Sequence, residues 1–153
     1  MNSIWTENIN KPKFSPLEKN INTDVLIIGG GISGILCAYI LKEKGVDYIL
    51  VEAKEICSGA SQNTTAKITV QHGLIYDNLI KKFGFNKAKL YLEAQKNALD
   101  EYSRLCKSIE CDYETKDSFV YSLNDKEKIE KEAIALNQLG EKAKFLQSVD
   151  IPL

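Results

Sequence analysis

The chain has 153 residues, with 20 Lys and Arg against 21 Asp and Glu, for a formal net charge of −1. Apolar residues make up 44% and charged residues 27%, which excludes disordered, collagen-like and low-complexity chains. The near-neutral charge provides no basic surface for DNA or RNA, so we expect no nucleic-acid partner. The length by itself predicts one compact domain.

Cysteines, histidine and hydropathy bear on location and metal binding. Four cysteines without C-x-x-C spacing predict reduced thiols in a cytoplasmic protein. His72 is the single histidine, so we expect no metal site and interpret it as structural. Residues 25–41 carry no charge but are fewer than the ~20 residues of a membrane span and include four glycines. We therefore expect no membrane span.

The first half of the chain predicts a strand–helix–strand unit. Residues 25–28 form a continuous apolar run, typical of a parallel strand covered on both faces. A helical pattern follows over 32–44, with Gly45 at its end. Residues 48–51 predict a second buried strand, so the three elements form a βαβ unit.

The second half predicts mostly helices. A long helix is expected over 86–109, because its apolar residues recur at steps of three and four. They are Tyr91, Ala94, Ala98, Tyr102, Leu105 and Ile109. Alternating residues over 118–123 predict a half-buried strand. Asn124 and Glu127 resemble a capping box that opens a helix ending near Gly140, and residues 144–147 could begin another strand.

A glycine-rich sequence lies between the first predicted strand and its helix. Gly29, Gly31 and Gly34 fit the pattern G-x-G-x-x-G. In this pattern the glycines permit a tight turn, a close approach to a pyrophosphate, and close packing of helix on strand. The pyrophosphate would lie on the free N–H groups at the start of the helix, at Ile32 and Ser33. The alternative is a purely structural turn, since such turns are common in α/β proteins.

An acidic residue closes the second predicted strand. Glu52 lies eighteen residues after Gly34 and is placed to accept hydrogen bonds from the ribose hydroxyls of an adenosine. A carboxylate at this place disfavours the 2′-phosphate of NADP. Strand, glycines, helix and acid together favour dinucleotide binding over a structural turn, with FAD and NAD both open on these grounds.

The next loop favours FAD through a family resemblance. Residues 23–73 resemble the beginning of the FAD-dependent oxidoreductases of the D-amino-acid oxidase and glycine oxidase type. The run SGASQNTTAKITVQHG at 58–73 is similar to a subgroup whose members often carry a Rieske iron–sulfur domain at the far C-terminus. A looser resemblance continues through residues 74–153.

The resemblance also implies roles for individual residues. Glu52 and Ala53 would contact the adenosine, and four loop residues would face the phosphates and flavin, namely Ser61, Thr64, Thr65 and Lys67. The three hydroxyl residues can instead cap the next helix. Lys67 can instead be an ordinary solvated side chain.

We predict an α/β fold, with a Rossmann-type FAD/NAD(P)-binding βαβ unit followed by the start of an α+β substrate domain. The expected parts are an irregular lead-in over 1–22, a dinucleotide-binding portion over 23–83 and a substrate-binding portion over 84–153.

The resemblance implies the N-terminal part of an enzyme that oxidises an amine or amino acid by hydride transfer to FAD. A complete enzyme of this type would be longer, so we expect a missing C-terminal portion and name no catalytic residue. A Rieske centre needs two cysteines and two histidines, which a chain with one histidine cannot supply. Two alternatives stay open: a truncated non-catalytic remnant, and a small module that binds NAD or ADP.

Overall fold

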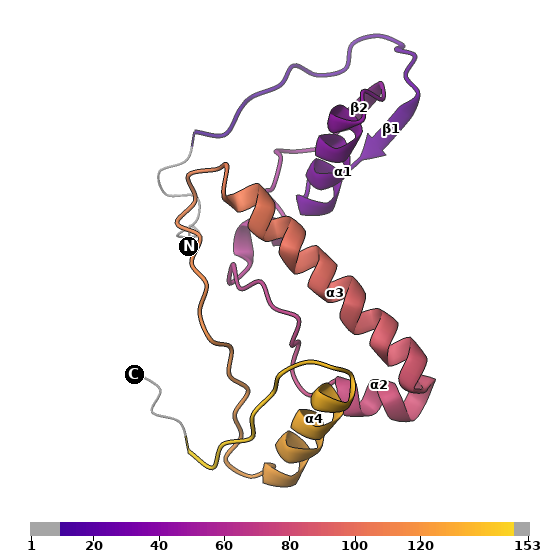
Figure 1. The fold of residues 1–153 in the computed structure, drawn as a ribbon. Helices are drawn as coiled ribbons and strands as arrows, with labels where there is room; N and C mark the ends of the chain where they lie inside the picture. The colour runs from indigo at the N-terminus through magenta and orange to yellow at the C-terminus, as the bar shows by residue number, and fades with distance from the viewer. Residues whose placement is uncertain (1–9, 149–153) are drawn as a thin grey trace. The chain divides into compact units, whose positions relative to one another are not determined.

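The computed structural model describes residues 10–148, which form two compact units dividing between Lys67 and Ile68 (Figure 1). Residues 1–9 of the predicted lead-in and the last residues of the chain lie outside the described part. The domain boundaries predicted at 22/23 and 83/84 stay predictions.

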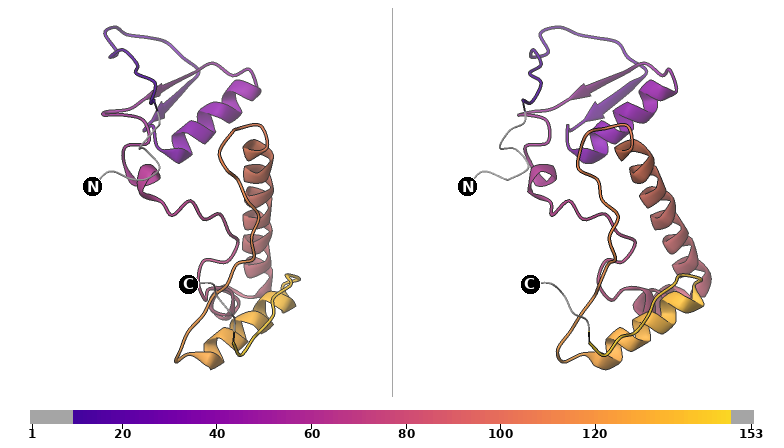
Figure 2. Two further views of the ribbon diagram at one scale, coloured as in Figure 1. Left: turned by 90° about the vertical axis from the view of Figure 1, so that its left-hand side faces the viewer. Right: turned by 60° about the vertical axis from the view of Figure 1, so that its left-hand side comes forward.

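The first unit contains the predicted βαβ sequence of elements. Strand β1 (Val25–Ile28) is followed by helix α1 (Ile32–Glu43) and strand β2 (Tyr48–Val51). The two strands are parallel, with Val25 opposite Tyr48 and Ile28 opposite Val51. Figure 2 shows α1 lying along one face of this small sheet. The mixed α/β class and the order strand–helix–strand are thereby confirmed.

The prediction that β1 is covered on both faces is wrong for the described chain. Helix α1 covers one face only, so Leu26 is 56% and Ile28 81% exposed. On the other face, residues 17–23 follow an irregular path and border a shallow hollow shared with Leu26, Ile49 and Val51. A continuous apolar run indicates that a strand can be buried twice, but it does not identify what covers it.

The corner between β1 and α1 depends on two glycines. Gly29 has a φ of +107°, which favours glycine, and its N–H donates to the Val51 carbonyl at 2.8 Å. At Gly34 an added Cβ would lie 2.0 Å from the Gly29 carbonyl oxygen. The helix can therefore approach the strand end only because residue 34 has no side chain.

The hydroxyl-rich loop after β2 contains a short 3₁₀ helix, η2 (Ala60–Asn63). The side-chain amides of Gln62 and Asn63 donate back to the carbonyls of Ser58 and Gly59. These local bonds give the loop a defined turn, although it has no apolar periodicity.

The second unit is helical: α2 (Tyr76–Phe83), α3 (Phe85–Cys106) and α4 (Lys126–Gln138). Its core is small, formed by Tyr76, Ala88, Leu92, Ala135, Leu136 and Leu139. Tyr76 is fully buried, donates to the Val70 carbonyl at 2.6 Å and meets the ring of Tyr91 edge-on. Burial raises the pKa of Tyr76 to about 12. Helix α2 was not predicted from the sequence.

The long helix is confirmed, but its predicted apolar face is wrong in part. Ala88 and Leu92 are buried and Leu99 is half-buried, whereas the predicted Ala94 and Ala98 are exposed. The predicted Tyr102 and Leu105 are half-buried. Both series have helical spacing, so periodicity alone could not choose between them. The helix also ends at Cys106, three residues before the predicted Ile109.

Within the described chain, no helix is both long and apolar enough to cross a lipid bilayer.

Three local predictions in the second half are wrong. Residues 118–123 form no strand, and Tyr121 and Leu123 are 74% and 94% exposed, because no neighbouring segment among residues 10–148 pairs with them. Residues 144–147 are likewise irregular. The capping box is not formed: Asp125 is the N-cap of α4 without a side-chain cap bond, and Glu127 pairs with Lys131. Gly140 does end the last turn of α4, as predicted.

A buried carboxylate joins α4 to the start of α2. Glu132 is 3% exposed, and its Oε1 accepts the N–H groups of Ile75 and Tyr76 at 2.9 and 2.8 Å. Its Oε2 accepts the N–H of Asp77 at 2.9 Å, and the Gln71 amide donates to Oε1 at 3.0 Å. Glu132 is therefore a cap supplied from another helix, at the end where the helix dipole favours negative charge.

We expect Glu132→Gln to lower the free energy of unfolding of the second unit by about 2 kcal/mol. The amide would place a donor against the N–H of Asp77 and remove the charge from the helix start. The measurement is urea unfolding followed by far-UV circular dichroism. Glu130→Gln, on the exposed side of the same helix, is the matched control, and equal midpoints for both variants would contradict this account.

We expect Gly34→Ala to destabilise the first unit by about 3 kcal/mol, because the methyl group forces α1 away from the end of β1. Gly59→Ala is the control, since an added Cβ there meets nothing within 4 Å. Thermal unfolding of both variants measures the difference. An unchanged midpoint for Gly34→Ala would show that the close approach is not needed.

Candidate functional site

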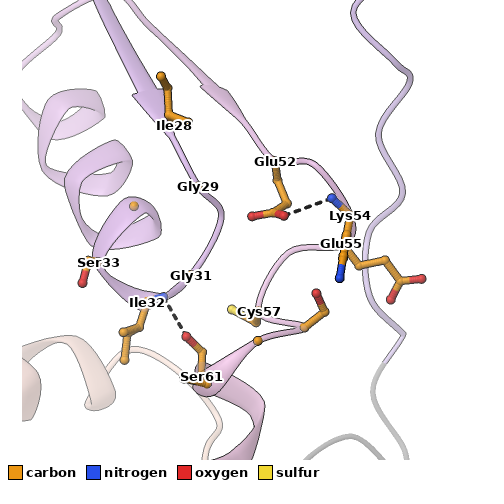
Figure 3. Close-up of a pocket in the computed structure, with 14 residues that line it drawn as sticks. Ile28, Gly29, Gly31, Ile32, Ser33, Glu52, Lys54, Glu55, Cys57 and Ser61 are labelled. Atoms are coloured by element: carbon orange, nitrogen blue, oxygen red, sulfur yellow. Dashed lines mark hydrogen bonds between the residues drawn. The ribbon is translucent and has the colours of Figure 1, made fainter.

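A hollow in the first unit lies at the carboxyl end of β1 (Figure 3). It has a volume of about 570 Å³ and is lined by the glycine corner, the first turn of α1, and residues between 52 and 61. In α/β proteins, ligands bind in the crevice outside the carboxyl ends of parallel strands. The hollow is therefore where such a unit binds a ligand.

The start of α1 brings the backbone of Ile32, Ser33 and Gly34 to the lining of this hollow. The helical ladder begins with the N–H of Ile35, which donates to the Gly31 carbonyl at 3.0 Å. The amides of Ser33 and Gly34 lie before that bond, so the ladder offers them no carbonyl. The first turn of α1 contains no acidic residue. This end of the helix therefore provides N–H donors and a positive dipole for an anion.

One amide at this helix start already has a partner. The N–H of Ile32 donates to the Ser61 Oγ at 3.0 Å, and Figure 3 shows the hydroxyl reaching it from η2. An added Cβ on Gly31 would lie only 3.4 Å from the same oxygen. Ser61 therefore caps α1, which precedes it in the chain. The alternative interpretation was that Ser61 caps the next helix along the chain.

Glu52 joins the end of β2 to the glycine corner. Its Oε2 accepts the N–H of Gly30 at 2.7 Å and its Oε1 accepts the N–H of Lys54 at 3.0 Å. The bond from Gly30, followed by that from Lys54, holds the pKa of the Glu52 carboxyl below its ordinary value of 4.5. Each carboxylate oxygen has a further acceptor site, and the side chain is exposed at the hollow. Glu52 can therefore accept additional donors from a ligand.

Gly30, the middle residue of the three consecutive glycines, has a structural role that was not predicted. Gly30 is buried, its N–H binds Glu52, and its carbonyl accepts the N–H of Cys57 at 2.8 Å. An added Cβ would lie 3.0 Å from Ile56 and 3.2 Å from Glu52. The pattern G-x-G-x-x-G allows any residue at this position. The presence of a glycine there, which makes a run of three, was a visible signal that the backbone is crowded.

Seven of the predicted site residues line the hollow: Gly29, Gly31, Ile32, Ser33, Gly34, Glu52 and Ser61. The structure does not place the other four on its lining: Ala53, Thr64, Thr65 and Lys67. These four are exposed, and the Thr64 hydroxyl accepts the N–H of Ala66 in a local turn. Lys54, Glu55 and Cys57 line the hollow and were not predicted to do so.

Outside the hollow, His72 is exposed, with its Nε2 3.4 Å from the Gln95 Oε1. Across residues 10–148, no group of three or more His, Cys, Asp or Glu side chains is arranged to hold a metal ion.

The sequence of this chain is similar to known proteins over most of its length. It is 38% identical to a putative Rieske 2Fe-2S iron-sulfur protein, YhfW, of Bacillus subtilis (strain 168), over 99% of this chain and 30% of that protein. It is 29% identical to gamma-glutamylputrescine oxidoreductase of Escherichia coli (strain K12), over 82% of this chain and 30% of that protein. A flavin-containing amine oxidase of Oncorhynchus mykiss is 50% identical over 36 residues, 24% of this chain and 7% of that protein.

The chain thus spans about a third of the length of the first two relatives. No solved structure matches it significantly. The sequence profile of the FAD dependent oxidoreductases, known as DAO, matches residues 24–151, a range that includes the glycine corner, Glu52 and the three helices of the second unit. The chain therefore belongs to the DAO family of FAD-dependent oxidoreductases.

Proposed function

We propose that the first unit binds the ADP half of FAD, in a protein that oxidises amines or amino acids by hydride transfer to the flavin. The observation that carries this proposal is the hollow itself, where the amides at the start of α1 and the Glu52 carboxylate face one space. These are donors for a pyrophosphate and acceptors for ribose hydroxyls, within one Rossmann-type βαβ unit.

The start of α1 fits the pyrophosphate. The amides of Ser33 and Gly34 lack partners in the helix ladder, and the glycines leave room for phosphate oxygens close to the backbone. The Ser61 hydroxyl now accepts the N–H of Ile32 in the way that a phosphate oxygen would. When phosphate binds, we propose that this hydroxyl turns to donate its proton to a phosphate oxygen.

Glu52 fits the adenosine ribose. A carboxyl with an ordinary pKa is ionised at neutral pH, and the bonds from Gly30 and Lys54 lower the pKa of Glu52 further, so both oxygens accept hydrogen bonds. The same charge would repel a 2′-phosphate, which disfavours NADP. We propose that Ala53 contacts the adenosine through its backbone, since it directly follows Glu52.

The remaining loop residues are proposed contacts of the more distant parts of the cofactor. Thr64, Thr65 and Lys67 lie in the segment after η2, in the part of the sequence that resembles flavoproteins. Bound FAD would supply the hydride acceptor. Residues 84–153 would begin the α+β substrate-binding portion, and a further portion of the protein would complete the site.

The proposed substrate class comes from the relatives. One is named as acting on gamma-glutamylputrescine and another as an amine oxidase. The second name states oxidation of an amine and the first names an oxidoreductase of a putrescine derivative, so we propose a small amine or amino acid as the substrate here.

We expect the chain to bind FAD saturably, measured by quenching of flavin fluorescence, and ADP to compete with FAD. Glu52→Gln should weaken both ligands about tenfold, because an amide accepts through one atom only. Glu55→Gln removes the same charge from the lining of the hollow and is the matched control.

Equal weakening in both variants would reduce the role of Glu52 to general charge. Absence of FAD binding would contradict the proposal for this chain. Saturable binding of NAD without FAD would favour a small nucleotide-binding module instead.

The lowered pKa of Glu52 predicts a pH dependence of stability. The ionised carboxylate is stabilised in the folded state, so its contribution is fully present above about pH 4.5 and is lost as the pH falls through the lower folded-state pKa. The urea midpoint difference between the unaltered chain and Glu52→Gln should therefore be constant near neutral pH and shrink below this range. A difference that does not change with acidification would contradict the bonding of Glu52 to Gly30 and Lys54.

A further inference from the structure

The chain reverses direction directly after α3. The N–H groups of Ser108 and Ile109 donate to the carbonyls of Leu105 and Cys106 at 3.1 and 3.3 Å, which forms a tight turn. A few residues later, Asp112 has a φ of +50°, in the left-handed region. The segment after the helix is therefore folded back by its own backbone bonds.

A side-chain bond holds this returning segment against α3. The Tyr113 hydroxyl and the Ser103 Oγ are 2.7 Å apart, and Ser103 also donates to the Leu99 carbonyl. Ser103 lies about one turn before Cys106 on the helix. Cys111 is thus held between the turn at its N-terminal side and the Tyr113 bond at its C-terminal side.

This arrangement brings the two cysteines together. The Cys111 thiol donates to the Cys106 carbonyl oxygen at 3.9 Å. Burial, and then the neighbouring Cys111 thiol, raise the pKa of the Cys106 thiol. Cys111 is exposed and Cys106 is half-buried. Cys111 is therefore the more accessible of the two to an external reagent, and Cys106 lies beside it.

We propose that Cys106 and Cys111 are a reversible dithiol–disulfide modification site, oxidised by small disulfides of the oxidised glutathione class. This site lies in the second unit and does not depend on the proposed binding of FAD.

The reaction takes two exchange steps. The Cys111 thiolate attacks one sulfur of the small disulfide, forms a mixed disulfide and releases one small thiol. The Cys106 thiolate then attacks the Cys111 sulfur, forms the Cys106–Cys111 bond and releases the second small thiol. Two protein thiols are oxidised and one small disulfide is reduced to two thiols, with each released thiolate taking up the proton that a cysteine lost.

The geometry predicts an easily reversed bond. Only residues 107–110 lie between the two cysteines, so closing the ring removes little entropy from the unfolded chain. Exposed disulfides of this kind are the labile ones, which small thiols reduce. The oxidation state of the pair should therefore follow the ratio of small disulfides to small thiols in solution, and the bond should add little to the stability of the fold.

Tryptic digestion tests the bond directly, because Lys107 separates the two cysteines. After treatment of the chain with oxidised glutathione, we expect peptide 105–107 to be recovered linked to peptide 108–116, and dithiothreitol to separate them. Cys111→Ser should abolish the linked peptide and leave the far-UV circular dichroism spectrum unchanged. Cys37 and Cys57, which lie in the first unit, provide the internal comparison and should not appear in linked peptides.

Tyr113→Phe tests whether the observed fold-back brings the thiols together. Loss of the bond to Ser103 should slow the second step severalfold, so that the mixed disulfide at Cys111 accumulates. Tyr121→Phe, at a tyrosine that is 74% exposed, is the matched control and should behave as the unaltered chain. A mixed disulfide at Cys111 that never resolves in the unaltered chain would overturn the proposal. Linkage of Cys111 to Cys37 or Cys57 as often as to Cys106 would also overturn it.

Discussion

The hydrogen bond between the Glu52 carboxylate and the Gly30 amide holds the candidate site together. It joins the end of β2 to the corner between β1 and α1, and the Gly30 carbonyl continues the connection to Cys57. A short chain of backbone and carboxylate bonds therefore connects Glu52 and Cys57, which both line the hollow. Because Glu52 is both a structural acceptor and the proposed ribose contact, the shape of the site and its chemistry depend on one side chain.

The start of α1 is the second part of this arrangement. A helix start needs acceptors for its first amides, and here Ile32 receives a side-chain acceptor, the Ser61 hydroxyl. The adjacent residues Ser33 and Gly34 line the hollow. The first turn of α1 contains no acidic side chain that would compete with an anion for their amides. The second unit shows the opposite solution, because Glu132 fills the start of α2 with a buried carboxylate. The two helix starts thus differ in structure: a carboxylate of the protein closes the start of α2, whereas the start of α1 is the proposed anion site.

Much of the first unit was predictable because its signals are local. The apolar runs, the glycine spacing and the acid after β2 predicted β1, α1 and β2, and seven of the predicted residues line one hollow. The Glu52–Gly30 bond and the cap from Ser61 were not predictable, since both connect residues more than twenty positions apart. Spacing also could not show that Thr64, Thr65 and Lys67 lie off the lining of the hollow.

The second unit was harder to predict for physical reasons. The alternation over 118–123 is a property of the segment, but a strand also needs a neighbour to pair with, and sequence alone does not show whether one is present. Helix α2 is short, and its start depends on Glu132, which lies more than fifty residues further along the chain. The capping box failed because α4 begins after Asp125 and not after Asn124, and the amides of both residues donate to the Ser122 hydroxyl. Glu127 instead forms an ion pair with Lys131 on its own helix.

The central claim is that the amides at the start of α1 bind the pyrophosphate of an ADP-containing cofactor. Titration of the ¹⁵N-labelled chain with ADP, followed by backbone amide NMR, tests this claim residue by residue. The account predicts saturable shifts at Ser33 and Gly34, with smaller shifts at Gly30 as the Glu52 bond adjusts. Saturable binding that leaves these amides unmoved, or no binding of ADP at all, would contradict it.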